Sequence, residues 1–443
     1  MSSRTDSLFS RLGGLLLLCA VLSVLTFREQ HEVSARVGSQ LASQILSESG
    51  LQNPHVLIVI PQDGESVRPE IQEFSEALQL GLKEKATVHF GQGDTRQIRK
   101  ILESLNSQGM KLDAIATTHE ASQWLLLTDQ DFVVDFPALG KPRIVAPRSY
   151  RWPDFLKARN LFNIADQITV IAVIAIGMTI VIITGGIDLS VGSLIAMSAV
   201  VSCLLIQQFG GGKEAGVGFM ILAALAGVAI TGAFGVANGL LITGLRMPPF
   251  IVTLSTMLAV SGAAYMLTKG ESAYKIPASF TWLGRGTVRG VPNSVVMLAG
   301  LYAAAQFVMT RTVWGRRLYA VGGNREAARL SGIRTERVLL AAYTCSAFLA
   351  GLGGVIMASQ LQSGSPMFGQ MYELYVIAAV VVGGTSLSGG RGSMLGTLTG
   401  VFIIAVINNG MNLLRVESYL QKVVMGLVIL VAVAIDQRRG TEK

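Results

Sequence analysis

Ionisable side chains are scarce in this chain of 443 residues, because Asp, Glu, Lys and Arg together make up only 14% of it. Soluble domains contain about 25% of such residues. The hydrophobic share is correspondingly high, at 51%. This balance excludes an ordinary soluble protein and predicts a chain that lies largely in a membrane.

Several signatures of chemistry are also absent. No Lys precedes a Ser or Thr, so the chain lacks a phosphate-binding loop of the type G-x-x-x-x-G-K-[ST]. Neither G-x-S-x-G nor H-E-x-x-H occurs. The three cysteines, Cys19, Cys203 and Cys345, lie inside apolar stretches without the spacing of a disulfide or metal site. The four histidines are scattered before the main apolar region, so we expect no metal and no cofactor.

Acidic residues are fewer than basic ones, which gives a formal net charge of +8. Such an excess is compatible with nucleic-acid binding. The Lys and Arg residues, however, lie largely in polar segments between apolar runs, as the cytoplasmic loops of membrane proteins do. We therefore expect no nucleic-acid partner.

Ten apolar stretches approach or exceed the length of about 20 residues that crosses a bilayer. We place them at 8–27, 161–184, 189–209, 216–243, 250–268, 293–310, 338–360, 374–388, 393–413 and 419–435. The first also has the length of a cleaved signal peptide. No small-residue cleavage site follows it, so we predict that residues 1–27 form a retained membrane anchor.

Arginine predicts the orientation of these stretches. The segment 311–337 contains seven arginines and only two acids, which predicts a cytoplasmic loop. Counting spans in both directions places both termini on the same side, and each terminus carries basic residues of its own. The loop 269–291 falls outside and is mildly basic, which is an observation against this scheme.

Residues 28–157 are polar enough to form a soluble domain. We predict strands at 55–60, 86–90, 112–117 and 143–146, and helices at 70–84 and 95–107. Strands that alternate with helices pair in parallel, so these residues predict a small α/β domain. The orientation above places the domain outside the cytoplasm.

The stretch "GGIDLSVG" (185–192) contains the only acidic or basic side chain between Ile168 and Gln207, Asp188. A carboxylate in apolar surroundings is costly unless it is paired, hydrated or at a helix end. The same G-G-x-x-L-S-x-G pattern returns in "GGTSLSGG" (383–390). Two interpretations remain open and compatible. The stretches are turns with a capping Asp188 or Ser190, or glycine-interrupted helices at the centre of a transporter.

A short amphipathic helix is predicted inside 311–337, with Asn324 as its N-cap and Gly332 as its end. From the pattern alone this helix is either a solvated connector or a docking element for a cytoplasmic partner.

From about Phe155 to Arg438 the chain resembles the permease subunits of bacterial ABC importers for ribose, xylose and related sugars. The stretches that carry the likeness are "GGIDLSVGSLIAMSAVV", "FIVTLSTM", "LYAVGGNREAARLSGI", "AAVVVGGTSLSGGRGSMLGTLTG" and "NNGMNLL". The resemblance implies a homodimeric permease of about ten helices that works with a cytoplasmic ATPase and a periplasmic sugar-binding protein. It also implies that Gly322–Ile333 is the coupling helix. The candidate coupling residues are Arg316, Arg317, Gly322, Asn324, Arg325, Glu326, Arg329 and Gly332.

The chain departs from this family in the length of residues 28–157, where such permeases have a short connection. The stretches "HVLIVIPQDG" and "DTRQIRKILESLNSQGMKLDAIATT" resemble the first lobe of a type I periplasmic sugar-binding protein. The second lobe is missing, so the insert is either a tethered docking or sensing module or a remnant with a structural role.

The sequence thus predicts an α-helical polytopic membrane protein of about ten transmembrane helices with an inserted small α/β extracytoplasmic domain. We expect an anchor at 1–27, the insert at 28–157 and the permease domain at 158–443, in a bacterial inner membrane with both termini cytoplasmic. Its expected function is import of a pentose or hexose by alternating access, without enzymatic activity of its own. The alternative is a membrane receptor whose outer domain binds a small ligand and signals through the basic loop.

Polar residues in or beside the apolar stretches are the candidates for the translocation pathway, since sugars require hydrogen-bonding groups. They are Asp188, Ser190, Asn238, Thr253, Ser386, Ser388, Asn408 and Asn409. For each of them, hydrogen bonding between helices is the alternative role.

Overall fold

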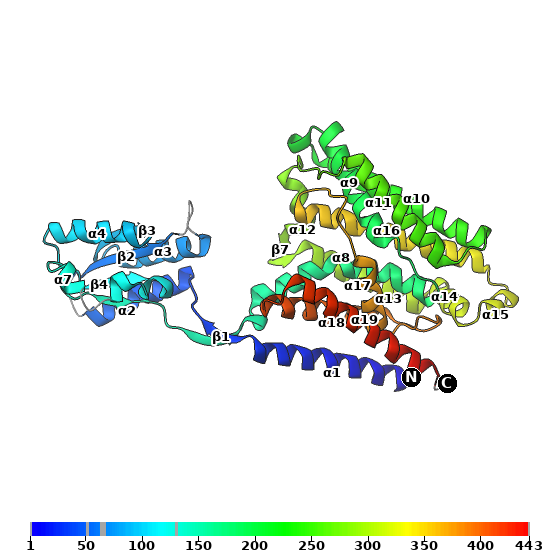
Figure 1. The fold of residues 1–443 in the computed structure, drawn as a ribbon, viewed down its shortest axis with the longest axis horizontal. Coiled ribbons are helices and arrows are strands. Elements are labelled where there is room, and N and C mark those ends of the chain that lie inside the picture. The colour runs from blue at the N-terminus through cyan, green and yellow to red at the C-terminus, as the bar shows by residue number, and fades with distance from the viewer. Residues whose placement is uncertain (1, 50–52, 63–67, 129–131, 442–443) are drawn as a thin grey trace. The chain divides into compact units, whose positions relative to one another are not determined.

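The computed structural model describes residues 2–49, 53–62, 68–128 and 132–441. The chain folds into two compact units, the first formed by Met1–Thr26 and Pro153–Lys443 and the second by Phe27–Trp152. Figure 1 shows both, with their helices and strands labelled. Basic residues that we used for orientation at the two ends, Arg4, Arg11, Arg438, Arg439 and Lys443, have side chains outside the described part.

The second unit is built on a parallel sheet with the strand order β3-β2-β4-β5. Its strands are β2 (His55–Pro61), β3 (Thr87–Gly93), β4 (Ala114–Thr117) and β5 (Arg143–Val145). They overlap the four predicted strands, although β3 continues past residue 90 to Gly93. A separate two-stranded sheet pairs β1 (Phe27–Gln30) with β6 (Tyr150–Pro153).

Helices cover both faces of this sheet. Alternate residues of β2 point to opposite sides, so Ile58 packs with α2 (Ala35–Ser49) and α3 (Pro69–Leu82), whereas Leu57 packs with α4 (Thr95–Ser107). Three helices of four residues each, α5 (His119–Ser122), α6 (Leu125–Thr128) and α7 (Phe132–Asp135), complete the unit. Our prediction missed α2, although Val37, Leu41 and Ile45 recur at helical spacing.

The first unit is a bundle of helices. Its long helices are α1 (Ser2–Leu25), α8 (Ala158–Ile183), α9 (Val191–Phe209), α10 (Val217–Gly244), α11 (Pro249–Thr268), α13 (Asn293–Arg311), α16 (Thr335–Leu361), α18 (Met394–Leu413) and α19 (Ser418–Thr441). The shorter ones are η1 (Asp154–Leu156), η2 (Gly212–Glu214), η3 (Ala278–Thr281), α12 (Trp282–Arg285), α14 (Val313–Gly323), α15 (Arg325–Leu330) and α17 (Tyr372–Val382). One hairpin joins β7 (Thr287–Val288) to β8 (Val291–Pro292).

Seven helices of the described residues are long and apolar enough to cross a membrane: α8, α9, α10, α11, α13, α16 and α18. Shorter apolar stretches lie at Leu12–Leu25, Tyr372–Val382 and Ser418–Ala434. The chain is therefore mostly helical and has the character of a multi-pass membrane protein.

Helix α16 lies at the centre of the bundle and packs against α8, α9 and α10 (Figure 1). Its most extensive packing is against α10. A Cβ atom at Gly235 of α10 would lie 2.8 Å from the backbone oxygen of Tyr343, so small residues let the two helices approach closely.

Two predicted boundaries are wrong. The stretch 374–388 is not one helix, because α17 ends at Val382 and a glycine turn follows. The segment 311–337 is not mainly loop, because α14 occupies most of its first half and α15 follows directly. We expected a single short helix there; the hydrophobic residues of α14, Leu318 and Val321, are buried in the bundle and stabilise a second one.

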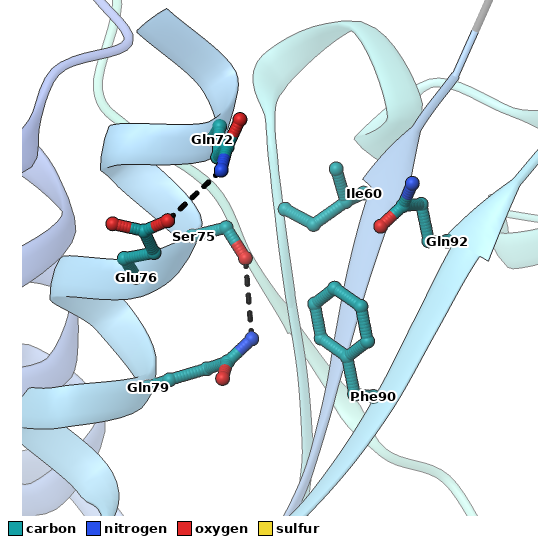
Figure 2. Close-up of a pocket in the computed structure, with 7 residues that line it drawn as sticks. All are labelled: Ile60, Gln72, Ser75, Glu76, Gln79, Phe90 and Gln92. Atoms are coloured by element: carbon teal, nitrogen blue, oxygen red, sulfur yellow. Dashed lines mark hydrogen bonds between the residues drawn. The ribbon is translucent and has the colours of Figure 1, made fainter. Parts of the chain in front are cut away.

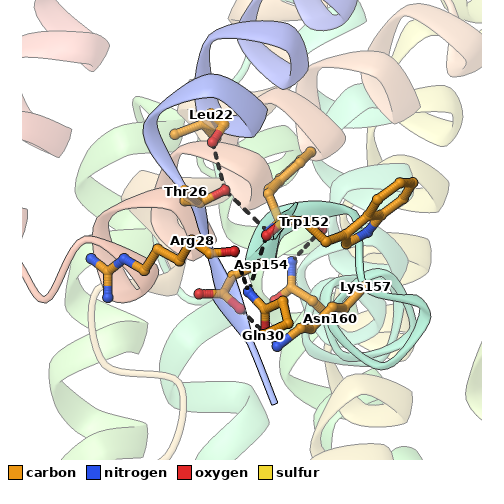
Figure 3. Close-up of polar contacts among 9 residues, drawn as sticks. Leu22, Thr26, Arg28, Gln30, Trp152, Asp154, Lys157 and Asn160 are labelled. Carbon is orange, nitrogen blue, oxygen red and sulfur yellow. Dashed lines mark hydrogen bonds and ion pairs between the residues drawn. The ribbon is translucent and has the colours of Figure 1, made fainter. Parts of the chain in front are cut away.

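Within the first unit, the end of α1 is hydrogen-bonded to the residues that precede α8. The backbone N–H of Asp154 donates to the carbonyl of Thr26 at 3.0 Å, and the N–H of Phe155 donates to Oγ1 of Thr26 at 3.2 Å. Figure 3 shows these residues, together with the ion pair of 2.8 Å between Lys157 and Asp154.

Candidate functional site

The two glycine-rich stretches end their helices in the same way. After α8, Gly185 adopts a φ of 79°, and the N–H of Gly186 donates to the carbonyl of Val181. After α17, Gly384 adopts a φ of 81°, and the N–H of Thr385 donates to the carbonyl of Val380. This backbone conformation favours glycine and closes the last turn of a helix. The repeated sequence pattern therefore encodes a repeated helix end.

Asp188 lies between α8 and α9 and is 1% exposed. Its carboxylate accepts hydrogen bonds from the N–H of Ser190 at 3.0 Å, from Oγ of Ser190 at 2.6 Å and from Oγ of Ser346 at 2.9 Å. No ion pair of Asp188 occurs among the described residues. Three hydrogen-bond donors, one of them from α16, thus compensate the carboxylate for its lost hydration.

The expected capping role is only partly correct. Ser190 precedes the first residue of α9, but its hydroxyl makes no capping bond and donates to Asp188 instead. At the second stretch the cap of α18 is Ser393, whose Oγ accepts from the N–H of Gly396 at 3.0 Å. The Ser190 hydroxyl donates to Asp188, and a hydrogen bond to an ionised acceptor is stronger than one between neutral groups.

Further polar side chains extend the Asp188 cluster to two other helices. Asn238 of α10 donates to Oγ of Ser190 at 3.3 Å and accepts from Oγ1 of Thr256 of α11 at 2.6 Å. Thr253 of α11 donates to the carbonyl of Ile187 at 3.3 Å. Four helices of the bundle, α9, α10, α11 and α16, are therefore joined around one buried carboxylate.

The remaining pathway candidates lie elsewhere. Ser386 and Ser388 contact each other, with their Oγ atoms 2.9 Å apart, in the turn after α17. Asn409 of α18 exchanges two hydrogen bonds, of 3.0 and 2.8 Å, with Asn160 of α8, which is a link between helices. Asn408 is half-buried on α18. The structure therefore brings together Asp188, Ser190, Asn238 and Thr253, but not the other four.

The glycine-rich stretches 185–192 and 383–390 form the first and second glycine turns. Helix α14, the end of α8 and the second glycine turn meet beside them. The N–H of Gly390 in the second turn donates to the carbonyl of Ile183, the last residue of α8, at 2.9 Å. Gly322 of α14 packs against both, because a Cβ there would overlap the Ile183 carbonyl and lie 2.7 Å from the nitrogen of Gly390. Tyr319 of α14 donates to the carbonyl of Gly392 at 3.0 Å. Only a glycine fits at position 322.

The candidate coupling residues are distributed over α14 and α15. Arg316, Arg317 and Gly322 belong to α14, and Asn324 accepts from the N–H of Ala327 at 2.9 Å, which confirms it as the N-cap of α15. Arg325, Glu326 and Arg329 follow on α15, and Gly332, with a φ of 81°, comes after its last turn.

Helix α15 carries an ion pair on its surface. Arg329 donates to Oε1 of Glu326 at 2.6 Å, one turn earlier on the helix. The Glu326 carboxylate raises the pKa of the Arg329 guanidinium above its ordinary value. Both side chains are exposed, so the pair is available to a partner.

Sequence reasoning missed Ser346, Thr256, Tyr343 and Tyr319. The Tyr343 side chain is fully buried, and a Cβ at Gly186 would overlap its hydroxyl, which has no hydrogen-bond partner among the described residues. Single polar residues in apolar helices carry no periodic signal. Ser346, Thr256 and Tyr343 were recognisable only as hydroxyl groups within predicted spans, which most often bond to their own helix. Tyr319 lies in the segment 311–337 that we predicted as a loop.

Similarity to known proteins covers the first unit. Residues 160–433 match the family described as "Branched-chain amino acid transport system / permease component". The chain is 42% identical over 306 residues to the ribose import permease protein RbsC of Bacillus subtilis (strain 168), which covers 69% of this chain and 92% of that protein. It is 34% identical over 343 residues to the xylose transport system permease protein XylH of Escherichia coli (strain K12), covering 64% and 86%. No solved structure matches the chain.

A D-allose transport system permease protein, AlsC of Escherichia coli (strain K12), is 36% identical over 283 residues, covering 64% of this chain and 85% of that protein. The members of this family are permease components of transport systems and not enzymes. The matched stretch contains the buried Asp188 cluster, both glycine turns and α14–α15. The chain belongs to this family of transport-system permease components.

Proposed function

We propose that this chain is the membrane permease subunit of an ABC importer for a monosaccharide, either a pentose or a hexose. The observation that carries the proposal is the similarity to permeases of ribose, allose and xylose over almost the whole length of those proteins. No feature of the described residues favours the receptor alternative.

The energy for import comes from a separate ATPase, since the chain has no phosphate-binding loop. We propose that Arg316, Arg317, Gly322, Asn324, Arg325, Glu326, Arg329 and Gly332 couple this ATPase to the bundle. Support comes from the exposure of Glu326 and Arg329 on α15 and from the close packing of Gly322 of α14 against the end of α8 and against Gly390. A displacement of α14 would reach both glycine turns directly.

The candidate residues of the translocation pathway fall into two groups. We propose that Asp188, Ser190, Asn238, Thr253 and Asn409 hold the pathway helices together, because their side chains are buried and hydrogen-bonded. Ser386, Ser388 and Asn408 are less buried, and we propose that they line the path of the sugar. Alternating access then requires the helices around Asp188 to move as a group.

The complete importer, in this proposal, contains two copies of the chain in the bacterial inner membrane and receives sugar from a periplasmic binding protein. Each copy crosses the membrane ten times, with the three shorter apolar stretches completing the seven long helices. Residues 311–337 and both termini are cytoplasmic, and residues 28–157 are periplasmic.

Transport by the reconstituted complex tests the function. The chain is purified from native membranes with its associated proteins, placed in liposomes and supplied with radiolabelled D-ribose, D-xylose or D-allose. We expect a co-purifying protein with a phosphate-binding loop and sugar accumulation with ATP but not with ADP. Absence of ATP-dependent uptake for all three sugars, with the ATPase and a sugar-binding protein both present, would refute the proposal.

A further inference from the structure

The second unit contains a groove of about 330 Å³ between α3 and the edge strand β3 (Figure 2). One wall is formed by four residues of α3, namely Gln72, Ser75, Glu76 and Gln79. The facing wall is formed by Ile60 of β2 and by Phe90 and Gln92 of β3. The groove belongs to the second unit alone and lies outside the residues that match the permease family.

Helix α3 presents polar residues to the groove and apolar residues to the core. The polar residues of α3 recur at positions 72, 75, 76 and 79, which places them on one side of the helix. Phe74 and Leu78 are fully buried between α3 and the sheet. On the strands, Ile60 is only 1% exposed, whereas Phe90 is 44% exposed. A large aromatic ring is thus presented to solvent directly opposite a row of polar side chains.

The polar wall is already partly organised. Gln72 donates to Oε1 of Glu76 at 3.0 Å, and Gln79 donates to Oγ of Ser75 at 3.3 Å, as Figure 2 shows. These bonds orient the side chains and engage one amide N–H of each glutamine. Each glutamine has a second N–H and a carbonyl, and Glu76 has a second oxygen, so the wall can still donate and accept.

The charge of the lining restricts the ligand. Its seven residues include one carboxylate, Glu76, and no cation. Phosphates and carboxylates are therefore disfavoured, because nothing in the lining compensates their charge. A neutral molecule with many hydroxyl groups fits the amide, hydroxyl and carboxylate groups of α3. The ring of Phe90 supplies a flat apolar surface for the C–H face of such a molecule.

We propose that this groove binds one monosaccharide, with the C–H face of the sugar on Phe90 and its hydroxyl groups towards α3. The site is additional to the transport pathway and does not depend on it. The groove is open to solvent, and water competes for each hydroxyl group, so the dissociation constant is expected on the order of millimolar.

Thiol protection in the full-length chain tests this site. In a variant without Cys19, Cys203 and Cys345, held in lipid nanodiscs, Gln79→Cys is labelled with a maleimide in the presence of increasing D-ribose, D-xylose or D-allose. At a sugar concentration about ten times the dissociation constant, the labelling rate should fall about tenfold. Gln72→Cys provides a second reporter on the same wall and should behave alike.

Leu80→Cys is the matched control, because Leu80 follows Gln79 on α3 but is 77% exposed and does not line the groove. Its labelling should not change with sugar. Adding Phe90→Ala to Gln79→Cys should abolish protection, while the labelling rate of Leu80→Cys in the same background reports that α3 is intact. The proposal would be overturned if sugar did not slow labelling of Gln79→Cys and Gln72→Cys, or slowed it no more than that of Leu80→Cys. It would also be overturned if glycerol protected these two positions as well as the sugars do.

Discussion

Asp188, which has no ion pair among the described residues, is stabilised by hydrogen-bond donors from two different parts of the fold. Ser190 is the second residue after Asp188 and contributes its amide and hydroxyl, whereas Ser346 comes from α16. The sequence indicates that Asp188 needs compensation but cannot identify Ser346, which is one of many small polar residues in apolar helices. Asp188 thereby connects the α8–α9 turn by a hydrogen bond to α16, the central helix of the bundle.

Substitutions at Asp188 should distinguish the effect of side-chain shape on stability from the effect of its hydrogen bonds. Asp188→Asn keeps the acceptor for Ser190 and presents an N–H to Ser346, whose hydroxyl can accept it, so folding should change little. Asp188→Leu leaves these donors without an acceptor, which costs about 1–3 kcal/mol for each one that stays unpaired. We expect a clearly lower unfolding temperature in detergent and reduced sugar uptake for the leucine variant only.

Ser346→Ala serves as the control for that comparison, because it removes one of the three donors and leaves the Ser190 amide and hydroxyl in place. Its unfolding temperature should lie between those of the wild type and Asp188→Leu. Equal unfolding temperatures for the asparagine and leucine variants would show that the hydrogen bonds to Asp188 do not contribute to stability.

At the level of elements, α14 is attached to the ends of two other helices through glycine contacts. Gly322 fits against the Ile183 carbonyl, and Tyr319 bonds to the backbone after the second turn. Such an arrangement suits a part that transmits movement, since packed helices shift as rigid bodies and transfer displacement where they touch.

Gly322→Ala and Gly323→Ala form a matched pair for this junction. A Cβ at position 322 would overlap the end of α8, whereas a Cβ at position 323 meets nothing within 4 Å. We expect Gly322→Ala to lower uptake at least several-fold and to weaken the dependence of ATP hydrolysis on sugar, with membrane insertion preserved. Gly323→Ala should behave like the wild type. Identical uptake by both variants would argue against transmission through this contact.

Local elements were predictable where one periodicity dominated a stretch. Strand β2 follows an aliphatic run, and α15 lies between the predicted Asn324 and Gly332 signals. Strands β1 and β6 were not predicted, because neither contains an aliphatic run. Helix α2 escaped prediction because its six apolar residues alternate with nine Gly, polar or charged residues. The contacts of Gly322 and Ser346 were not predictable, because they join segments that are distant in the chain and depend on how helices pack.

For the whole molecule, we propose from the distribution of arginine in the sequence that residues 311–337 are cytoplasmic and residues 28–157 are periplasmic. Single cysteines at Arg325 and at Gln92, in a chain without other cysteines, report this directly. An impermeant thiol reagent should label the Arg325 position only in inverted vesicles and the Gln92 position only in intact spheroplasts. Labelling of both positions from one side would exclude the proposed topology.

The hydrogen bond between Asp154 and Thr26 has a consequence for how such a chain can arise and be altered. Because Thr26 and Asp154 are neighbours in the folded bundle, the 126 residues of Phe27–Trp152 leave and rejoin the helical unit at a single point. One in-frame insertion or deletion can therefore add or remove them without moving a membrane helix. The same point is a suitable attachment site for any soluble domain whose own ends lie close together.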